Sequence, residues 1–221
     1  VRGKTVLVRA DLNVPMQDGK VTDATRISRF APTVKSLTDR GAAVVVMTHL
    51  GRPASEPNPL FSTRPIAERL QGELGHPVEF ASDCVGPIAE SVTANMVPGD
   101  VTVLANLRFH AGETENSHSF AVRLSVNGDL YVNDAFSCSH RAHASTSAIA
   151  ERLPAYAGPS LVQEVGALET AVVSPDRPGI AIVGGAKVST KSAVLKNLVE
   201  RLDGVIIGGG MANTFLHAAE K

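Results

Sequence analysis

Short apolar runs of strand length alternate along this chain with longer segments of helical periodicity, and this alternation limits the possible folds more than any other feature. The runs are rich in β-branched residues and are mostly bounded by Gly, Pro or Asp, so we expect strands that are buried on both faces. They are TVLVRA (5–10), AAVVVMT (42–48), VTVLA (101–105), DLYVND (129–134), GIAIVG (179–184) and GVIIGG (204–209).

The segments between these runs carry apolar residues at helical spacing. The apolar positions of 25–40 share one face, although Pro32 must start or kink that helix. The segment 62–74 has Pro65 near its start, and 189–202 begins with a serine that could cap it. Strands that alternate with helices of this length form βαβ units. The sequence therefore predicts an α/β fold with a doubly wound, mostly parallel, Rossmann-like sheet.

One further helical segment, 160–173, is typical of a connection between domains. It begins with the capping pair Ser160 and Gln163, and loop-like stretches that contain proline lie on both sides of it. Beyond it only about 45 residues remain, few for a self-sufficient core, so we expect an incomplete second domain and a chain that is part of a longer protein. The predicted parts are an N-terminal domain over 1–157, a connecting helix or hinge over 158–175, and the start of a second α/β domain over 176–221.

Composition and charge narrow the class of protein. No apolar run approaches the roughly 20 residues needed to span a bilayer. The two cysteines, Cys84 and Cys138, and the lack of a secretory signal at the N-terminus of this sequence favour the cytoplasm. The 21 Lys and Arg balance 22 Asp and Glu, and aromatic residues make up only 4%, which argues against nucleic-acid binding. We expect small-molecule partners, with no nucleic acid and no membrane.

Cationic side chains follow four strands of the predicted first domain. They and their polar neighbours are Arg9, Asp11, Asn13 and Arg26 after the first strand, His49 and Arg52 after the second, Arg108 after the third and Arg141 after the fourth. Because ligands bind beyond the carboxyl ends of parallel strands, these cations should converge on one edge of the sheet. Arginine binds carboxylate and phosphate through paired hydrogen bonds. The pattern indicates either a site for a small, hydroxylated polyanion or a set of structural salt bridges.

The stretch SCSHRAHAS (137–145) admits other interpretations. Cys138, His140 and His143 could bind zinc, but no second CxxC or HxxxH pair completes the set, so we expect no metal site in this chain. A Cys–His nucleophile would need the two side chains in contact and a third group to orient them. Histidines that are hydrogen-bonded within a packed loop are the simplest interpretation.

Glycine-rich turns follow the last two predicted strands, GGAKVSTK (184–191) and GGGMAN (208–213). Backbone N–H groups in such turns can approach an anion, and a helix N-terminus adds partial positive charge. Lys187 and Lys191 are four residues apart and would lie on one side of a helix. The first turn does not match a Walker A loop, and Asn213 stands where the dinucleotide fingerprint requires Gly or Ala. The two turns suggest a nucleotide, and a dinucleotide-dependent oxidoreductase is the weaker alternative.

Six motifs in this order together resemble the phosphoglycerate kinase family: VRADLNVP, THLGRP, NLRF, NDAF…HRAHAS, GGAKVSTK and GGGMANTF. The resemblance covers nearly the whole chain. It implies two doubly wound α/β domains joined by a helix, and a monomer. It also implies the glycolytic, reversible transfer of a phosphoryl group between 1,3-bisphosphoglycerate and ADP, with Mg2+, giving 3-phosphoglycerate and ATP. The family's chains are much longer, and the resemblance implies that the acidic Mg2+ ligand lies outside this segment.

The resemblance also implies a role for each matching residue. In the first domain, the glycerate oxygens would be bound by Asp11, Leu12 and Asn13, the carboxyl end by Arg26, and the phosphate that is not transferred by His49, Leu50, Gly51, Arg52, Arg108 and Arg141. In the second domain, the nucleotide would be bound by Gly185, Ala186, Lys187, Lys191 and Gly210. Arg26 and Lys187 would be catalytic, because both would neutralise charge on the transferred group when the cleft between the domains closes.

Two positions depart from the family pattern. Ala105 stands where the family commonly has glutamate, and SCS at 137–139 replaces a segment that commonly contains glycine. Neither change removes an inferred ligand. The alternative function is that the 221-residue chain alone is a non-catalytic phosphoglycerate-binding module, and we expect this chain by itself to be inactive.

Overall fold

The computed structural model describes residues 1–189 and 191–219, and the chain divides into two compact units, 1–162 and 163–221. The division falls within the helix α6 (Pro159–Leu168). The expected connecting segment 158–175 spans this point. Its role as a hinge, and the domain boundaries at its two ends, stay predictions.

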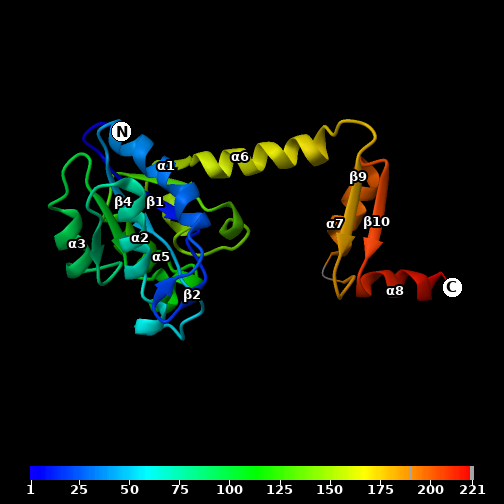
Figure 1. Ribbon diagram of the computed structural model, residues 1–221, viewed down its shortest axis with the longest axis horizontal. Coiled ribbons are helices and arrows are strands. Elements are labelled where there is room, and N and C mark those ends of the chain that lie inside the picture. The colour runs from blue at the N-terminus through cyan, green and yellow to red at the C-terminus, as the bar shows by residue number, and fades with distance from the viewer. Residues whose placement is uncertain (190, 220–221) are drawn as a thin grey trace. The chain divides into compact units, whose positions relative to one another are not determined.

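The first unit is built on a six-stranded sheet in which every neighbouring pair is parallel (Figure 1). In spatial order the strands are β5 (Glu79–Ala81), β6 (Val101–Leu104), β4 (Ala43–Met47), β1 (Thr5–Ala10), β7 (Leu130–Asp134) and β8 (Ala155–Ala157). The four predicted strands of this unit are confirmed to within one residue at each end. A small antiparallel pair, β2 (Met16–Gln17) and β3 (Lys20–Val21), lies outside the sheet.

Helices cover both faces of this sheet, as the alternation of strands and helices predicts. They are α1 (Thr25–Asp39), α2 (Arg64–Leu74), α3 (Pro87–Thr93), α4 (Ala111–Thr114) and α5 (His118–Ser125). Short 3-10 turns lie between the main elements: η1 (Pro59–Phe61), η2 (Leu107–Phe109), η3 (Phe136–Cys138) and η4 (Ala148–Glu151).

Alternate residues of β1 enter two separate hydrophobic cores, because successive side chains of a strand point to opposite faces. Val6 and Val8 pack with residues of α1 and α2 in one core. Leu7 packs with residues of α3 and α5 in the other. The doubly wound architecture is therefore confirmed.

Helix starts in this unit differ from the predictions at two places. The helix α1 begins at Thr25 and continues through Pro32, which lies on its exposed side, so of the two predicted effects of this proline, starting or kinking the helix, the first is wrong. The helix α6 begins at Pro159, one residue before the predicted cap Ser160. Its first turn is instead capped by Asp134 at the end of β7, which accepts hydrogen bonds from the backbone N–H groups of Ser160 (2.7 Å) and Leu161 (3.3 Å).

The second unit contains a parallel pair of strands, β9 (Ile180–Gly184) and β10 (Gly204–Gly208), which confirms both predicted strands to within one residue. A π-helical turn, η5 (Glu169–Val173), follows α6, and the helices α7 (Ser192–Arg201) and α8 (Gly210–Ala218) follow the two strands. The residue that precedes α7 is Lys191, and its side chain makes no capping bond, so the predicted serine cap at the start of 189–202 is wrong. Among the described residues, no helix has both the length and the apolar character needed to cross a membrane.

Candidate functional site

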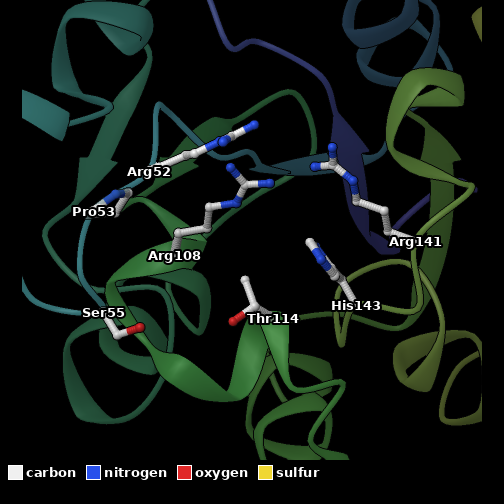
Figure 2. Close-up of a pocket in the computed structure, with 7 residues that line it drawn as sticks. All are labelled: Arg52, Pro53, Ser55, Arg108, Thr114, Arg141 and His143. Carbon is white, nitrogen blue, oxygen red and sulfur yellow. The ribbon is translucent and has the colours of Figure 1, made fainter. Parts of the chain in front are cut away.

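Three arginines that follow three different strands surround one pocket of about 350 Å³ in the first unit, which we call the cationic pocket. It is lined by Arg52, Pro53, Ser55, Arg108, Thr114, Arg141 and His143. Figure 2 shows Arg52 and Arg108 on one side of it and Arg141 and His143 on the other. Since β4, β6 and β7 run parallel in one sheet, their carboxyl ends bring these loops to the same edge.

Within the part of the chain that the structure describes, none of these three guanidinium groups forms an ion pair with a carboxylate. Arg108 donates from Nη1 to the carbonyl oxygen of Gly51 (2.7 Å), but its buried Nε has no acceptor among the described residues. Burial and the nearby charges of Arg141 and Arg9 lower the pKa of Arg108. A cluster of cations without carboxylate ion pairs among the described residues favours an anionic ligand over the structural salt bridges considered from the sequence.

Gly51 connects the loop after β4 to the loop after β1 by a hydrogen bond. The N–H of Gly51 donates to Oδ1 of Asn13 (2.8 Å), and the φ of Gly51, +60°, lies in the left-handed region. A Cβ at this position would lie 2.5 Å from the ring of Phe61, so only glycine fits. Leu12 and Leu50 are buried in the core, so only their backbone atoms are placed to meet a ligand.

Asp11 and Arg26 form an ion pair, and Ser137 donates a hydrogen bond to the same carboxylate. Burial raises the pKa of Asp11, but the hydrogen bond from Ser137 and the charge of Arg26 outweigh it, so that the pKa lies below its ordinary value. Arg26 is half exposed and lies outside the set that lines the cationic pocket. It would have to leave Asp11 to bind the carboxyl end of a ligand.

His49 is held as a neutral hydrogen-bond donor. Nη2 of Arg9 lies 3.0 Å from its Nδ1, and because a guanidinium group only donates, Nδ1 accepts and the ring proton resides on Nε2. Burial and the charges of Arg9 and Arg108 lower the pKa of His49 to about 3.

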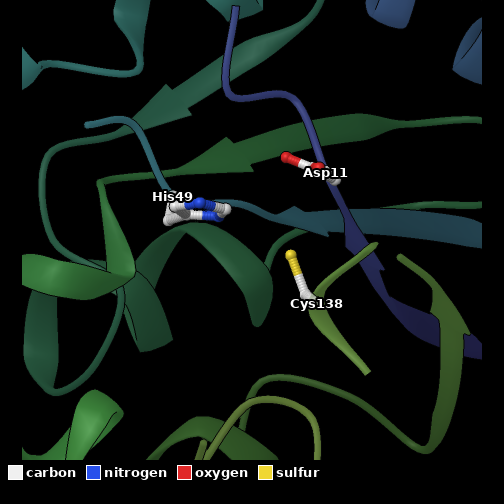
Figure 3. A group of neighbouring side chains, drawn as sticks. All are labelled: Asp11, His49 and Cys138. Carbon is white, nitrogen blue, oxygen red and sulfur yellow. The ribbon is translucent and has the colours of Figure 1, made fainter. Parts of the chain in front are cut away.

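Asp11, His49 and Cys138 form a group of side chains that could bind a metal ion. One atom from each, a carboxylate oxygen, a ring nitrogen and the sulfur, lies within 4.8 Å of the other two, and Figure 3 shows the thiol directed towards the other two side chains.

The zinc alternative for Cys138, His140 and His143 is not supported by the positions of these residues. Cys138 is buried near Asp11 and His49, whereas His140 is exposed. His143 lines the cationic pocket, with Nδ1 3.8 Å from a carboxylate oxygen of Glu113.

Arg9 and Glu113 hold the site from behind, a structural role that the sequence predicted for neither residue. Arg9 was expected after the first strand with the other cations; it lies instead within β1, one residue before its end, where it is buried and donates from Nε to Oγ of Ser145 (2.9 Å). Ser145 in turn donates from its backbone N–H (2.9 Å) and its Oγ (2.6 Å) to the fully buried Glu113. The chain from Glu113 through Ser145 and Arg9 to His49 therefore fixes the wall of the site.

The glycine turns of the second unit meet backbone to backbone. The N–H of Met211 donates to the carbonyl oxygen of Gly185 (2.9 Å), and a Cβ on Gly209, whose φ is +65°, would lie 3.1 Å from that same oxygen. The side chain of Lys191 packs beside Gly185, and a Cβ on Gly210 would come 3.5 Å from Cα of Ala186. Four of the five predicted nucleotide residues are therefore neighbours.

The remaining predicted nucleotide residue, Lys187, is described in the structure, whereas Thr190 of the motif 184–191 lies outside the described residues. A Cβ on Gly208 would meet no atom of the described residues within 4 Å, so they leave the backbone at the end of β10 open to close approach. An open glycine at the end of β10 and a lysine at the start of α7 fit the phosphates of a nucleotide. Among the described residues of this unit, no group of three acidic, His or Cys side chains is placed to hold a metal ion.

The chain is similar to known proteins along its whole length. The family model for phosphoglycerate kinase matches residues 1–221. A phosphoglycerate kinase of Methylorubrum extorquens is 55% identical over 221 residues, which are 100% of this chain and 55% of the relative. One of Mesorhizobium japonicum is 55% identical over 218 residues, which are 99% of this chain and 55% of the relative.

Solved structures show the same likeness. The structure of phosphoglycerate kinase from Coxiella burnetii matches with a TM-score of 0.88 at 40% identity, over 99% of this chain and 55% of that one. The enzyme from Pyrococcus horikoshii matches with a TM-score of 0.87 at 36% identity, over 100% of this chain and 56% of that one. The chain spans about half the length of the relatives it matches. On its sequence and its fold, the chain belongs to the phosphoglycerate kinase family.

Proposed function

We propose that the protein to which this chain belongs acts as a phosphoglycerate kinase, transferring a phosphoryl group reversibly between 1,3-bisphosphoglycerate and ADP in glycolysis. The observation that carries the proposal is the cationic pocket, where Arg52, Arg108 and Arg141 converge without carboxylate partners among the described residues. Three guanidinium groups suit a phosphate, because each can donate two parallel hydrogen bonds to its oxygens.

The proposed substrate lies with its non-transferred phosphate in the cationic pocket. His49 donates from Nε2 to the same phosphate, in agreement with its low pKa and its contact with Arg9. The glycerate part extends towards Asp11, whose carboxylate can accept a hydrogen bond from the hydroxyl group, and towards Asn13.

The transferred group is the acyl phosphate at the carboxyl end of the substrate. Phosphoryl transfer requires mainly positioning and neutralisation of the charge on the equatorial oxygens. Arg26 and Lys187 are the proposed catalytic residues for this neutralisation. Gly185, Ala186, Lys191 and Gly210 are proposed to bind the phosphates of ATP or ADP, and Mg2+ bound with the nucleotide would offset the charge of the phosphates.

The proposal extends to the setting of the enzyme. Its partners are the small-molecule substrates and nucleotides, its expected compartment is the cytoplasm, and its expected state is a monomer. The 221-residue chain alone is expected to bind the glycerate substrate without turnover, because its nucleotide-binding unit contains only two strands among the described residues.

Calorimetric titration of the 221-residue chain with 3-phosphoglycerate, and separately with MgADP, tests this proposal. Binding of 3-phosphoglycerate with little or none of the nucleotide is the expected result. Nucleotide binding without binding of 3-phosphoglycerate would mean that the arginines serve a structural purpose. Absence of turnover by the complete protein with 3-phosphoglycerate and ATP would overturn the assigned activity.

A further inference from the structure

Asp83, Cys84 and His110 form a second group of metal-binding side chains, and none of them lines the cationic pocket. Asp83 and Cys84 follow β5 closely, and His110 follows the turn η2 that succeeds β6. Because β5 and β6 are parallel neighbours, the segments after their carboxyl ends come together. One ligand atom from each side chain lies within 4.8 Å of the other two.

This group is already held in place without an ion. Oδ1 of Asp83 accepts a hydrogen bond from the N–H of Cys84 (2.6 Å) and lies 2.7 Å from Nε2 of His110. The imidazole ring packs against Phe120, with 5.3 Å between ring centroids. The ring packing holds the imidazole, and the N–H of Cys84 orients the carboxylate, so both side chains have defined positions before an ion binds.

The three side chains differ in their exposure to solvent: two are partly exposed and the third is buried. The side chains of Asp83 and His110 are 34% and 28% exposed. Cys84 is completely buried among the residues of the second core. An ion would enter from solvent past the carboxylate and the imidazole and meet the thiol at the inner end.

The two groups of possible metal ligands differ in the sign of the charge that surrounds them. Near Asp11, His49 and Cys138, the guanidinium groups of Arg9, Arg26 and Arg108 repel a cation, and Arg9 occupies Nδ1 of His49. That group suits an anion.

Burial raises the pKa of the Cys84 thiol most; the charges of Asp83 and Glu113 raise this pKa further, and the charge of Arg123 lowers it. Two carboxylates against one guanidinium group give a net negative surrounding, which attracts a cation. Among the described residues, this is the group of three ligands whose surroundings favour a metal ion.

We propose that Asp83, Cys84 and His110 bind a zinc-class divalent ion through a carboxylate oxygen, the thiolate sulfur and an imidazole nitrogen. The thiol loses its proton to solvent on binding, and the hydrogen bond between Asp83 and His110 is replaced by two bonds to the metal. Bonds of about 2.0–2.3 Å place tetrahedral ligands roughly 3.3–3.8 Å apart. The carboxylate and imidazole, now 2.7 Å apart, would therefore open to this spacing, while ligand atoms up to 4.8 Å apart would approach by about 1 Å, and water completes the fourth position. The ion would tie the segment after β5 to the segment after β6.

Titration of the reduced 221-residue chain with Co2+ tests the proposal directly. A thiolate bound to Co2+ gives a sulfur-to-metal charge-transfer band in the near ultraviolet, and displacement of Co2+ by Zn2+ then gives the zinc affinity. The chain has only two cysteines, and each belongs to one of the two groups. We expect Cys84→Ser to abolish the band and the matched control Cys138→Ser to retain it.

Two further variants leave the buried thiol in place. Asp83→Asn keeps an oxygen that can accept the bond from the N–H of Cys84, and His110→Gln changes a partly exposed side chain. Each should weaken Zn2+ binding by at least about tenfold, and they decide the question if Cys84→Ser does not fold. Absence of the band in the unaltered chain, its loss in Cys138→Ser, or full affinity in both of these variants would overturn the proposal. None of these measurements depends on phosphoglycerate binding, so the metal site and the proposed function stand or fall separately.

Discussion

At the scale of single residues, the cationic pocket places like charges close together before any ligand is present. Arg108 is the clearest case, because burial and the charges of Arg141 and Arg9 all lower its pKa. A bound phosphate would relieve both the repulsion and the unsatisfied Nε of Arg108. The affinity for an anionic substrate therefore depends on individual guanidinium groups rather than on net charge.

Arg141→Ala is expected to weaken binding of 3-phosphoglycerate by about 2–3 kcal/mol, or roughly 30- to 150-fold in Kd, because a charge-assisted contact is lost. The matched control is Arg64→Ala, which removes the same charge from α2, where the guanidinium group lies over the ring of Phe80. Calorimetry should show an unchanged Kd for the control. Equal weakening in both variants would mean that only long-range charge matters.

His49 links the stability of the fold to pH. Its pKa is about 3 in the folded chain, against an ordinary value of 6.5, so unfolding takes up a proton between these two values. The free energy of unfolding should be constant above about pH 6.5 and fall below it, by up to about 1.4 kcal/mol per pH unit.

His49→Gln should remove this part of the pH dependence, because the amide does not titrate and its oxygen can still accept a hydrogen bond from Arg9. Urea unfolding at pH 7 and pH 5 measures the difference, expected to be about 2 kcal/mol smaller in the variant. His118→Gln, on the surface of α5, is the control and should keep the slope. The same slope in all three chains would contradict a neutral, buried His49.

Residue identities in the sequence predicted the cations of the pocket but not the groups that hold them. Arg52, Arg108 and Arg141 follow apolar runs, and that position relative to a strand is visible in the sequence. Glu113 gives no such signal, because a glutamate in a short polar segment is ordinarily solvated. Its burial becomes apparent only when the fold brings Ser145 beside it.

At the scale of elements, the carboxyl end of β7 supports two helices through Asp134. Its carboxylate accepts a hydrogen bond from Thr33 of α1 (2.9 Å) and from the hydroxyl of Ser160 in α6 (3.1 Å), besides the two N–H groups of the α6 first turn. A carboxylate at the N-terminus of a helix is favourable on charge as well as on hydrogen bonding. Gly158 allows this approach, since a Cβ there would lie 2.4 Å from Oδ1 of Asp134.

Asp134→Ala is expected to lower the free energy of unfolding of the first unit by about 2–3 kcal/mol, because it removes the cap of α6 and the contact to α1 together. Ser160→Ala is the matched control, which removes one hydroxyl but leaves both N–H bonds to the carboxylate, and should cost less than about 1 kcal/mol. Urea unfolding curves measure both. A loss in Asp134→Ala no larger than that of the control would show that the cap contributes little.

The sequence predicted those strands that have a long apolar run. It did not predict features that depend on a contact between residues far apart in the chain. The four long strands of the first unit have such runs, whereas β5 and β8 have three residues each, too few for a period to be recognised. The cap of α6 was assigned to Ser160 because a local motif is visible in the sequence. The actual cap comes from a residue 26 positions earlier in the chain, which only the folded sheet brings near.

At the scale of the whole molecule, the two units differ greatly in how much apolar surface they bury. The first unit has two extensive cores, one on each face of its sheet. Among the described residues of the second unit, only Leu195 and Met211 are buried. Ile180 and Ile182 of β9 remain 60% and 78% exposed. Because few residues follow the connecting segment, the sequence predicted a small core for the second unit, but it did not predict which strand faces would be exposed.

Hydrogen–deuterium exchange of the 221-residue chain should therefore separate the two units. Local opening needs less free energy where few apolar contacts are lost, so the amides of β9 and β10 should exchange well before those of β1 and β4. The comparison has an internal control, because both pairs are parallel and hydrogen-bonded. Equal protection of the two pairs would mean that the second unit is stabilised by more than its own buried side chains. The expected result, faster exchange in β9 and β10 alone, would mean that the sheet with the cationic pocket is the more stable part of the chain.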